Sequence, residues 1–247
     1  MLNINNISKS FDNKQILKNI SLELAQGEII SILGQSGSGK STILNLIAGF
    51  EELDCGSITY KQKLLSSQRT FVEPQNRDIG FVFQNYALFP HLNVKQNILF
   101  GIDKEPKSTK ARVLHEMIEL LGLEGKEDQY PHQLSGGQQQ RVAIARSIAK
   151  GSDIILFDEV FSSIDSILKL RLITQIKRIL KERNITAIFV THSPREAVML
   201  SDKIAYIENG QILQYDTPKN LNQNPASQSI SNLFGDNSFI FSKVQFH

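Results

Sequence analysis

The chain has 247 residues, 40% of them hydrophobic, so it is long enough to bury a core as one large domain or two small ones. Its 27 Lys and Arg residues nearly balance its 25 Asp and Glu residues, a composition that indicates neither a nucleic-acid nor an anionic-membrane surface. The single cysteine, Cys55, excludes an internal disulfide framework and a cysteine zinc cluster, and it fits a reducing compartment.

The N-terminal stretch, residues 1–11, has neither a basic leader nor an apolar core, so no secretory signal is visible. No uninterrupted apolar run approaches the roughly 18 residues that a membrane helix needs. We therefore expect a cytoplasmic protein whose association with a membrane goes through a partner.

Alternating apolar and polar residues predict two half-buried antiparallel strands at 2–7 and 16–24, with Asp12 and Asn13 in the turn between them. Phe11, just before that turn, could offer a flat face to an adenine ring or could pack the hairpin. The residues alone leave both interpretations open.

The sequence GQSGSGKST, residues 34–42, lies between an apolar run that predicts a strand and a run that predicts a helix, which is the order of a phosphate-binding loop. Its glycines let successive backbone N–H groups converge on phosphates, and the following helix adds the positive end of its dipole. Lys40 would reach the β- and γ-phosphates, Ser41 would offer its hydroxyl to Mg²⁺, and Thr42 would be a further donor. The alternative is a glycine-rich turn without a ligand.

Strands are also predicted at 56–60 and 79–83, the second ending just before Gln84. From 85 to 150 the pattern changes to helices with apolar stripes, which indicates a helical insert. The stripes lie at 94–100, 111–121 and 139–149.

The apolar run 153–157 predicts a buried parallel strand that delivers Asp158 and Glu159 at its carboxyl end. A long amphipathic helix over 168–180 and a buried strand at 186–191 follow. Strands that alternate with helices in this way predict a doubly wound α/β core.

The remaining residues predict a short helix at 194–200 and a hairpin of strands 204–208 and 211–214 across the turn Asn209-Gly210. The polar stretch 222–231 is expected to be loosely held.

Five motifs in one order, spread over nearly the whole chain, closely resemble the ATP-binding subunits of ABC transporters. They are GQSGSGKST at 34–42 (Walker A), Gln84 (Q-loop), LSGGQQQR at 134–141 (signature), ILFDE at 155–159 (Walker B) and THS at 191–193 (switch histidine). The sequences of 80–98 and 130–149 are typical of importer ATPases for ferric iron, polyamines, sugars and oxyanions. The segments AGFEELDCGSI at 48–58 and YPHQLSGGQQQ at 130–140 are most similar to the ferric-iron branch.

The resemblance implies an α/β fold of the P-loop NTPase (RecA-like) type, with a parallel-sheet core, an N-terminal antiparallel β subdomain and an inserted α-helical subdomain. We expect an ABC ATP-binding domain over 1–232, with the helical subdomain at about 85–150. Residues 233–247 would be a short C-terminal tail, either of a short form or as a remnant of the β-rich regulatory domain that many relatives carry.

The resemblance also implies a role for each motif residue. Asp158 would hold the Mg²⁺ shell, and Glu159 would polarise the attacking water. His192 would contact the γ-phosphate and hold Glu159 in register, while Gln84 would touch Mg²⁺ or the water. Without the resemblance, the two acids could be solvated charges on a turn, and His192 could be structural.

The turn Ser135 to Gln138 could simply cap a helix, but in the family it covers the γ-phosphate bound by the other subunit. Hydrolysis would then require two copies that close over two ATP molecules. The residues expected to contact nucleotide are Phe11, Gly34, Gln35, Ser36, Gly37, Ser38, Gly39, Lys40, Ser41, Thr42, Ser135, Gly136, Gly137 and Gln138. Those expected at the metal are Ser41, Gln84 and Asp158, and those expected in catalysis are Lys40, Gln84, Glu159 and His192.

The expected protein is therefore an ATPase that uses ATP and Mg²⁺, forms a homodimer and docks through residues 85–98 on a separate integral-membrane permease at the cytoplasmic face of the cell membrane. An extracytoplasmic solute-binding protein would be an indirect partner, and no nucleic acid is expected. One alternative is a soluble ATP-driven clamp of the DNA-repair type, but the chain has no sustained heptads for its coiled coils. The other alternative is a P-loop kinase, in which the LSGGQ sequence would have no function.

Three places depart from the family's usual pattern. Val160 stands where proline is usual, SSID at 162–165 replaces SALD, and Ser193 replaces an aspartate. None is a group with a proposed chemical role, so we expect them to bear on the geometry of the dimer interface.

Overall fold

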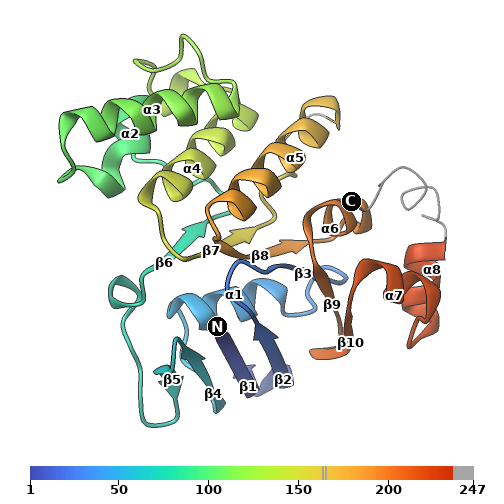
Figure 1. Ribbon diagram of the computed structural model, residues 1–247. Coiled ribbons are helices and arrows are strands. Elements are labelled where there is room, and N and C mark those ends of the chain that lie inside the picture. The colour runs from blue at the N-terminus through green and yellow to red at the C-terminus, as the bar shows by residue number, and fades with distance from the viewer. Residues whose placement is uncertain (163, 165, 236–247) are drawn as a thin grey trace.

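The computed structural model of the chain describes residues 1–162, 164 and 166–235, and Figure 1 shows two sheets with helices around them. A four-stranded antiparallel sheet has the order β2-β1-β4-β5, and a six-stranded sheet has the order β10-β9-β3-β8-β7-β6. The small sheet contains β1 (Leu2–Phe11), β2 (Lys14–Leu24), β4 (Cys55–Tyr60) and β5 (Lys63–Ser67). The large sheet contains β3 (Ile29–Leu33), β6 (Ile79–Val82), β7 (Ile154–Asp158), β8 (Thr186–Thr191), β9 (Lys203–Glu208) and β10 (Gln211–Asp216).

Helices cover both faces of the large sheet, and α2, α3 and α4 form a separate layer beyond it (Figure 1). The α-helices are α1 (Lys40–Ala48), α2 (Val94–Leu99), α3 (Lys107–Leu121), α4 (Gly136–Lys150), α5 (Ser166–Glu182), α6 (Pro194–Leu200), α7 (Pro218–Gln223) and α8 (Gln228–Gly235). Short 3-10 turns are η1 (Pro74–Asn76), η2 (Phe100–Ile102) and η3 (Pro131–Gln133). None of the described helices is long and apolar enough to cross a membrane.

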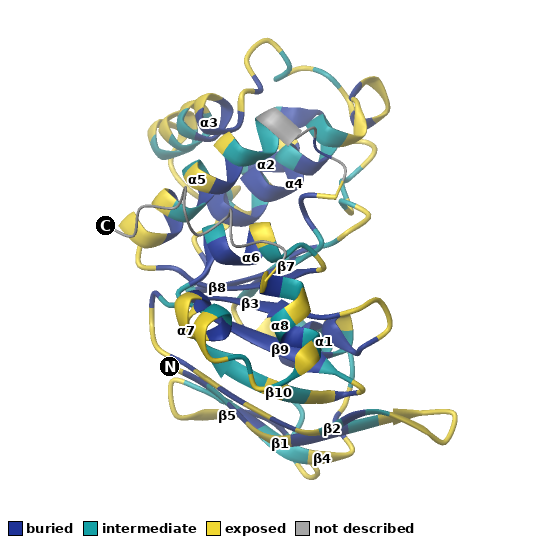
Figure 2. Cartoon of the chain, turned by 90° about the vertical axis from the view of Figure 1, so that its right-hand side faces the viewer, coloured by how far each residue is buried: buried dark blue, intermediate teal, exposed yellow. Residues whose placement is uncertain are grey.

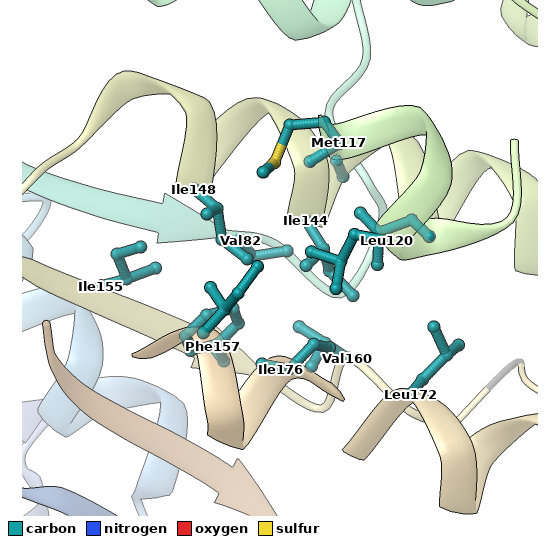
Figure 3. Packing of buried hydrophobic residues seen from close by; sticks show 14 of the residues in the cluster. Val82, Met117, Leu120, Ile144, Ile148, Ile155, Phe157, Val160, Leu172 and Ile176 are labelled. Atoms are coloured by element: carbon teal, nitrogen blue, oxygen red, sulfur yellow. The ribbon is translucent and has the colours of Figure 1, made fainter. Parts of the chain in front are cut away.

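The large sheet is buried on both faces because apolar side chains point alternately to each side of its strands. In β7, Ile155 and Phe157 belong to a cluster with residues of α3, α4 and α5, part of which Figure 3 shows. Ile154 and Leu156 belong instead to the cluster formed with α1 and the small sheet. Figure 2 shows the consequence, with dark blue strands at the centre and exposed residues concentrated in loops and on outer helix faces.

This architecture confirms the predicted α/β core with an antiparallel β layer and a helical insert. One strand was missed: β5 (Lys63–Ser67) was not predicted, because its sequence lacks a clear alternation. The polar stretch 222–231 includes the start of α8, whose Ile230 is fully buried in a cluster with Leu33 and Tyr206. Within the SSID segment, residues 163 and 165 lie outside the described residues, as do residues 236–247 of the tail.

Arg77, between η1 and β6, holds the end of α1 in place. Its side chain is almost fully buried, and its Nη1 donates to the carbonyl oxygens of Leu46 and Ile47 at 2.9 and 2.8 Å. Its Nε donates to the carbonyl oxygen of Val72 at 2.7 Å and its Nη2 to the hydroxyl of Ser66 at 2.7 Å. Burial lowers the pKa of Arg77 to about 10, so it stays protonated at neutral pH and complements the negative end of the α1 dipole.

We expect Arg77→Ala to lower the free energy of unfolding by about 3 to 5 kcal/mol, because several buried carbonyl oxygens would lose their donor. Urea denaturation followed by circular dichroism would measure the loss. The matched control is Arg178→Ala, whose exposed guanidinium lies 3.7 Å from Glu182 and should contribute less than about 1 kcal/mol. Equal, small losses for the two variants would contradict this role of Arg77.

Candidate nucleotide-binding site

The predicted phosphate-binding, metal and catalytic residues meet at one end of the large sheet. Strands β3, β6, β7 and β8 run parallel, so their carboxyl ends lie on the same side (Figure 1). Gly34 follows β3, Gln84 follows β6, Glu159 follows β7 and His192 follows β8. In open sheets of this kind, ligands bind at the carboxyl ends of the strands.

The loop between β3 and α1 depends on its glycines in two different ways. A Cβ on Gly34 would lie 2.3 Å from the carbonyl oxygen of Ile207, and a Cβ on Gly39 would lie 2.5 Å from the side chain of Leu17. Gly39 and Gly37 also have positive φ values, +98° and +78°, which side chains rarely permit. Gly37 has no neighbour within 4 Å of its Cβ position, so its positive φ, and not a lack of space, favours glycine there.

Lys40, the first residue of α1, folds back over this loop. Its ammonium donates to the carbonyl oxygens of Gly34 at 3.0 Å and Gln35 at 2.8 Å. Burial lowers the pKa of Lys40, and the carboxylates of Glu159 and Asp158 oppose that shift. A buried cation beside the glycine loop and a helix N-terminus is an arrangement that binds phosphate.

The side chains of Ser41 and Asp158, the predicted metal ligands, lie against each other. The Ser41 hydroxyl donates to Oδ1 of Asp158 at 2.9 Å, so the two oxygens are close enough to share one cation. Such hard oxygen ligands suit Mg²⁺, which takes one or two protein ligands and completes its shell with water and phosphate. Among the described residues, no group of three or more His, Cys, Asp or Glu side chains could hold a metal ion.

Burial raises the pKa of Asp158, and the nearby charge of Glu159 adds to the shift, while Ser41 and Lys40 oppose it. A carboxylate with a raised folded-state pKa destabilises the fold when it is ionised, so its cost is present at neutral pH and disappears as the pH falls below its unfolded value. We therefore expect Asp158→Asn to raise the melting temperature of the nucleotide-free protein at pH 7, with the gain vanishing toward pH 3. Thermal unfolding across that pH range would measure it.

When Mg²⁺ and ATP are added, the order of the two melting temperatures should reverse, with the parent melting at the higher temperature. At about 100 times its dissociation constant a ligand stabilises the parent by about 2.7 kcal/mol. Asp158→Asn should gain clearly less, because it lacks the carboxylate expected at the metal. A variant that is less stable than the parent without nucleotide at pH 7 would contradict the assigned cost of this carboxylate.

Glu159 is the centre of a second group. Its Oε2 accepts a hydrogen bond from Gln84 Nε2 at 3.4 Å and lies 3.8 Å from Nδ1 of His192. Its backbone is left-handed, with φ of +48°, and its N–H donates to the carbonyl oxygen of Val190 at 3.1 Å. A glutamate in this conformation costs on the order of 1 kcal/mol, and such local strain is found where a side chain must point in one direction.

The unusual Ser193 and Val160 both have structural roles. The Ser193 hydroxyl accepts from the N–H of Glu196 at 3.4 Å and so caps α6, while its own N–H donates to the hydroxyl of Thr191 at 3.0 Å. Serine and aspartate are equally good N-caps, so the exchange preserves the geometry after His192. Val160 is buried in the cluster under α4 and α5 (Figure 3).

The signature turn starts α4 and is exposed at its tip. Ser135 and Gln138 form a reciprocal cap: the Ser135 hydroxyl accepts from the Gln138 N–H at 3.4 Å, and Oε1 of Gln138 accepts from the Ser135 N–H at 2.9 Å. The described side-chain hydrogen bonds of these two residues stay within the turn and do not reach Lys40. The structure thus does not join the signature to the phosphate loop of the same chain.

Phe11 lies at the end of β1 with 39% of its surface exposed and with the Lys9 ammonium 4.9 Å from its ring centre. Its hairpin borders a hollow of about 280 Å³ beside the phosphate loop. The lining residues include Lys14, Ile16 and Lys18 from the hairpin and Gln35, Ser36, Gly37 and Ser38 from the loop. The adenine-stacking role of Phe11 stays a prediction.

Comparison with known proteins agrees with this geometry. Residues 17–162 match the family described as ABC transporter. The chain is 41% identical to the sulfate/thiosulfate import ATP-binding protein CysA of Thermosynechococcus vestitus, over 98% of this chain and 72% of that protein. It is 40% identical to the Fe(3+) ions import ATP-binding protein FbpC of Haemophilus influenzae, over 96% of this chain and 68% of that one.

Among solved structures, a dimeric ATP-binding cassette in a post-hydrolysis state, bound to ADP and Pi, superposes with a TM-score of 0.78 at 31% identity. The superposition covers 88% of this chain and 99% of that cassette. The likeness therefore extends to the whole of a cassette and to its sequence as well as its fold. The chain belongs to the ABC transporter family, as one of its ATP-binding cassettes.

Proposed function

We propose that this cassette is the ATP-hydrolysing subunit of an importer, that it acts as a homodimer and that it drives a separate membrane permease. The observation that carries the proposal is the convergence of Lys40, Asp158 and Glu159 at one sheet edge, with Gln84 and His192 against the same glutamate. This set can hold a triphosphate, a divalent cation and an attacking water together.

In this mechanism the loop N–H groups and Lys40 bind the phosphates and neutralise the charge that develops on transfer. When bound between Ser41 and Asp158, Mg²⁺ would supply further neutralisation of the β- and γ-phosphate oxygens. Glu159 accepts a proton from the water through Oε2, which Gln84 and His192 hold in place. Gln84 and His192 approach the same carboxylate oxygen of Glu159. In the proposed mechanism they therefore fix on which side of that carboxylate the water lies.

The dimer part of the proposal follows from the exposed signature turn. Ser135 and Gly136 lie at the N-terminus of α4, where backbone N–H groups and the helix dipole favour an anion. A second copy would place its own γ-phosphate there, so that each ATP is bound between two chains. The solved cassette that superposes with a TM-score of 0.78 is itself described as dimeric, which supports the assembly.

A hydrolysis assay with the purified chain tests the proposed activity. We expect conversion of ATP to ADP and phosphate that stops on addition of EDTA and returns with Mg²⁺. A P-loop kinase would instead transfer phosphate to an added acceptor, and a DNA-repair clamp would bind DNA at physiological salt. The absence of Mg²⁺-dependent hydrolysis, alone and with the permease, would overturn the proposal.

The permease would dock on the helical layer beside α2, on the expected segment 85–98 and the adjoining η2. Phe100, two residues beyond that segment, is 54% exposed, and its ring lies 4.3 Å from that of Phe89. Phe100 also lines a hollow of about 560 Å³ between α2, η2 and the start of α3. Aromatic residues are enriched at protein interfaces, which supports docking of the permease at this place. Phe100→Glu should therefore leave the hydrolysis of the isolated subunit unchanged and reduce its co-purification with the permease.

Through that permease the subunit would lie at the cytoplasmic face of the cell membrane, with an extracytoplasmic solute-binding protein as its indirect partner. Ferric iron remains the predicted solute, because short segments of the sequence are most similar to the ferric-iron branch. Relatives named for sulfate/thiosulfate and for Fe(3+) are 41% and 40% identical to this chain, so identity does not separate the two solutes.

A further inference from the structure

The backbone on both sides of His192 is held by a buried carboxylate that the motifs do not include. Glu196 lies in the first turn of α6, four residues beyond His192, and is only 8% exposed. Its Oε2 accepts a hydrogen bond from the hydroxyl of Thr191 at 2.6 Å, and its Oε1 accepts one from the ammonium of Lys169 at 3.1 Å. A buried carboxylate needs partners of this kind, because an unpaired buried charge is costly.

The Thr191 hydroxyl connects this carboxylate to the residue after His192. It accepts a hydrogen bond from the N–H of Ser193 at 3.0 Å, and it donates its single proton to Glu196. The Ser193 hydroxyl accepts in turn from the N–H of Glu196 at 3.4 Å. The residues before and after His192 therefore belong to one closed ring of hydrogen bonds, formed by Thr191, Ser193 and Glu196.

His192 depends on this ring for its direction, because 64% of its own side chain is exposed. An imidazole that lies mostly in solvent has few packing contacts to orient it. Its Nδ1 lies 3.8 Å from Oε2 of Glu159, and the N–H of Glu159 donates to the carbonyl oxygen of Val190, the residue before Thr191. The end of β8 therefore sets the positions of both His192 and Glu159, and Glu196 holds the end of β8.

Helix α5 holds Glu196 in its turn. Lys169 of α5 has 23% of its side chain exposed and supplies the charge opposite the carboxylate. Eight residues further along α5, which is about 12 Å on a helix, Lys177 donates to the carbonyl oxygen of Met199 at 2.9 Å. Helix α6 is thus bound to α5 at both ends, and the end with Glu196 is the one that adjoins His192.

A purely structural interpretation is that Glu196 serves α6 alone, because an acidic residue in the first turn complements the positive end of the helix dipole. That role requires neither burial of the carboxylate nor a bond to Thr191. Both are present, and both connect Glu196 to the strand end that carries His192.

We propose that Glu196 is a positioning residue for ATP hydrolysis. Ionised and paired with Lys169, its carboxylate holds Thr191 and Ser193 so that the imidazole between them meets Glu159. The inference rests on the proposed function, and it adds a residue that acts through His192 rather than on ATP.

The test measures ATP hydrolysis by the full chain with Glu196→Met or Thr191→Val, which keep similar side-chain volumes and remove either the acceptor or the donor of the 2.6 Å bond. We expect kcat to fall about tenfold in both variants, because a misplaced catalytic group lowers the rate. The KM for ATP should stay within about twofold of the parent, since the phosphate loop is intact. Thr191→Ser keeps the hydroxyl and should retain kcat within about twofold.

A double-mutant cycle tests whether the effect passes through His192. In a His192→Ala background, the further loss on introducing Glu196→Met should be less than about twofold in single-turnover hydrolysis, because the group to be positioned is gone. Losses that multiply would show that Glu196 supports the fold without acting through His192, and they would overturn the proposal.

Lys177→Met is the matched control, since it removes the bond at the other end of α6 and leaves the ring around His192 intact. It should lower the melting temperature and keep kcat within about twofold of the parent. A fall in kcat equal to that of Glu196→Met would overturn the positioning role, because any loosening of α6 would then have the same effect.

Should Glu196→Met fail to fold in a thermal melt, Thr191→Val gives the same comparison with the charge pair retained. An active parent whose kcat is unchanged by either variant would refute the positioning role alone. A parent protein without Mg²⁺-dependent hydrolysis, alone and with the permease, would instead refute the proposed function, so the two failures are distinguishable.

Discussion

Replacing Glu159 by glutamine should lower kcat by about a thousandfold while leaving ATP affinity within about twofold of the parent, since a positioned general base contributes roughly 10² to 10⁴ in rate. The amide keeps the size of the side chain and can still meet Gln84 and His192, which lie 3.4 and 3.8 Å from Oε2. It cannot accept the proton of the attacking water. The Mg²⁺-ATP complex should therefore persist, and with it the closed dimer.

Single-turnover hydrolysis and size-exclusion chromatography with Mg²⁺ and ATP would measure both effects. The matched control is Glu119→Gln on α3, a highly exposed glutamate that should change neither rate nor dimerisation. Hydrolysis by Glu159→Gln close to the parent rate would show that another group activates the water. A variant that binds ATP and stays monomeric even with the permease would contradict the two-chain site.

How far the sequence predicts this site depends on whether each contact is local. The phosphate loop was predictable because β3, the glycines and α1 are consecutive, and each residue type meets a requirement of backbone geometry. The meeting of Glu159 with His192 was expected from the family resemblance, and it agrees with the position of both residues after buried parallel strands, whose carboxyl ends share one edge. The site roles themselves stay predictions until variants are measured.

Other contacts could not be read from local patterns. Arg146 looks like an ordinary surface charge on α4, and only the tertiary structure shows its guanidinium on the carbonyls of residues 86 and 87. In the same way, the burial of Phe234 depends on Tyr206 and Leu33, which lie far away in sequence. Periodicity records which residues are apolar, and it carries no information on which distant element they meet.

The strongest test of the dimer is a mixture of two inactive variants. Lys40→Ala removes the cation that lies over the phosphate loop, and Ser135→Arg places a bulky side chain on the exposed signature turn. Each homodimer would then have two defective sites. In the Lys40→Ala homodimer both phosphate loops are defective, and in the Ser135→Arg homodimer both signature turns are. We expect each variant alone to lose about a thousandfold in kcat, because binding and charge stabilisation in the transition state are removed.

Mixed in equal amounts, the two variants should regain about a quarter of the parent rate, since half of the dimers are mixed and each mixed dimer has one intact site of its two. That site combines the phosphate loop of the Ser135→Arg chain with the signature of the Lys40→Ala chain. Two preparations of Lys40→Ala mixed together are the control and should stay inactive. If mixed dimers form on the column and the rate does not recover, the signature turn does not complete its partner's site, because each defect would then act within its own chain.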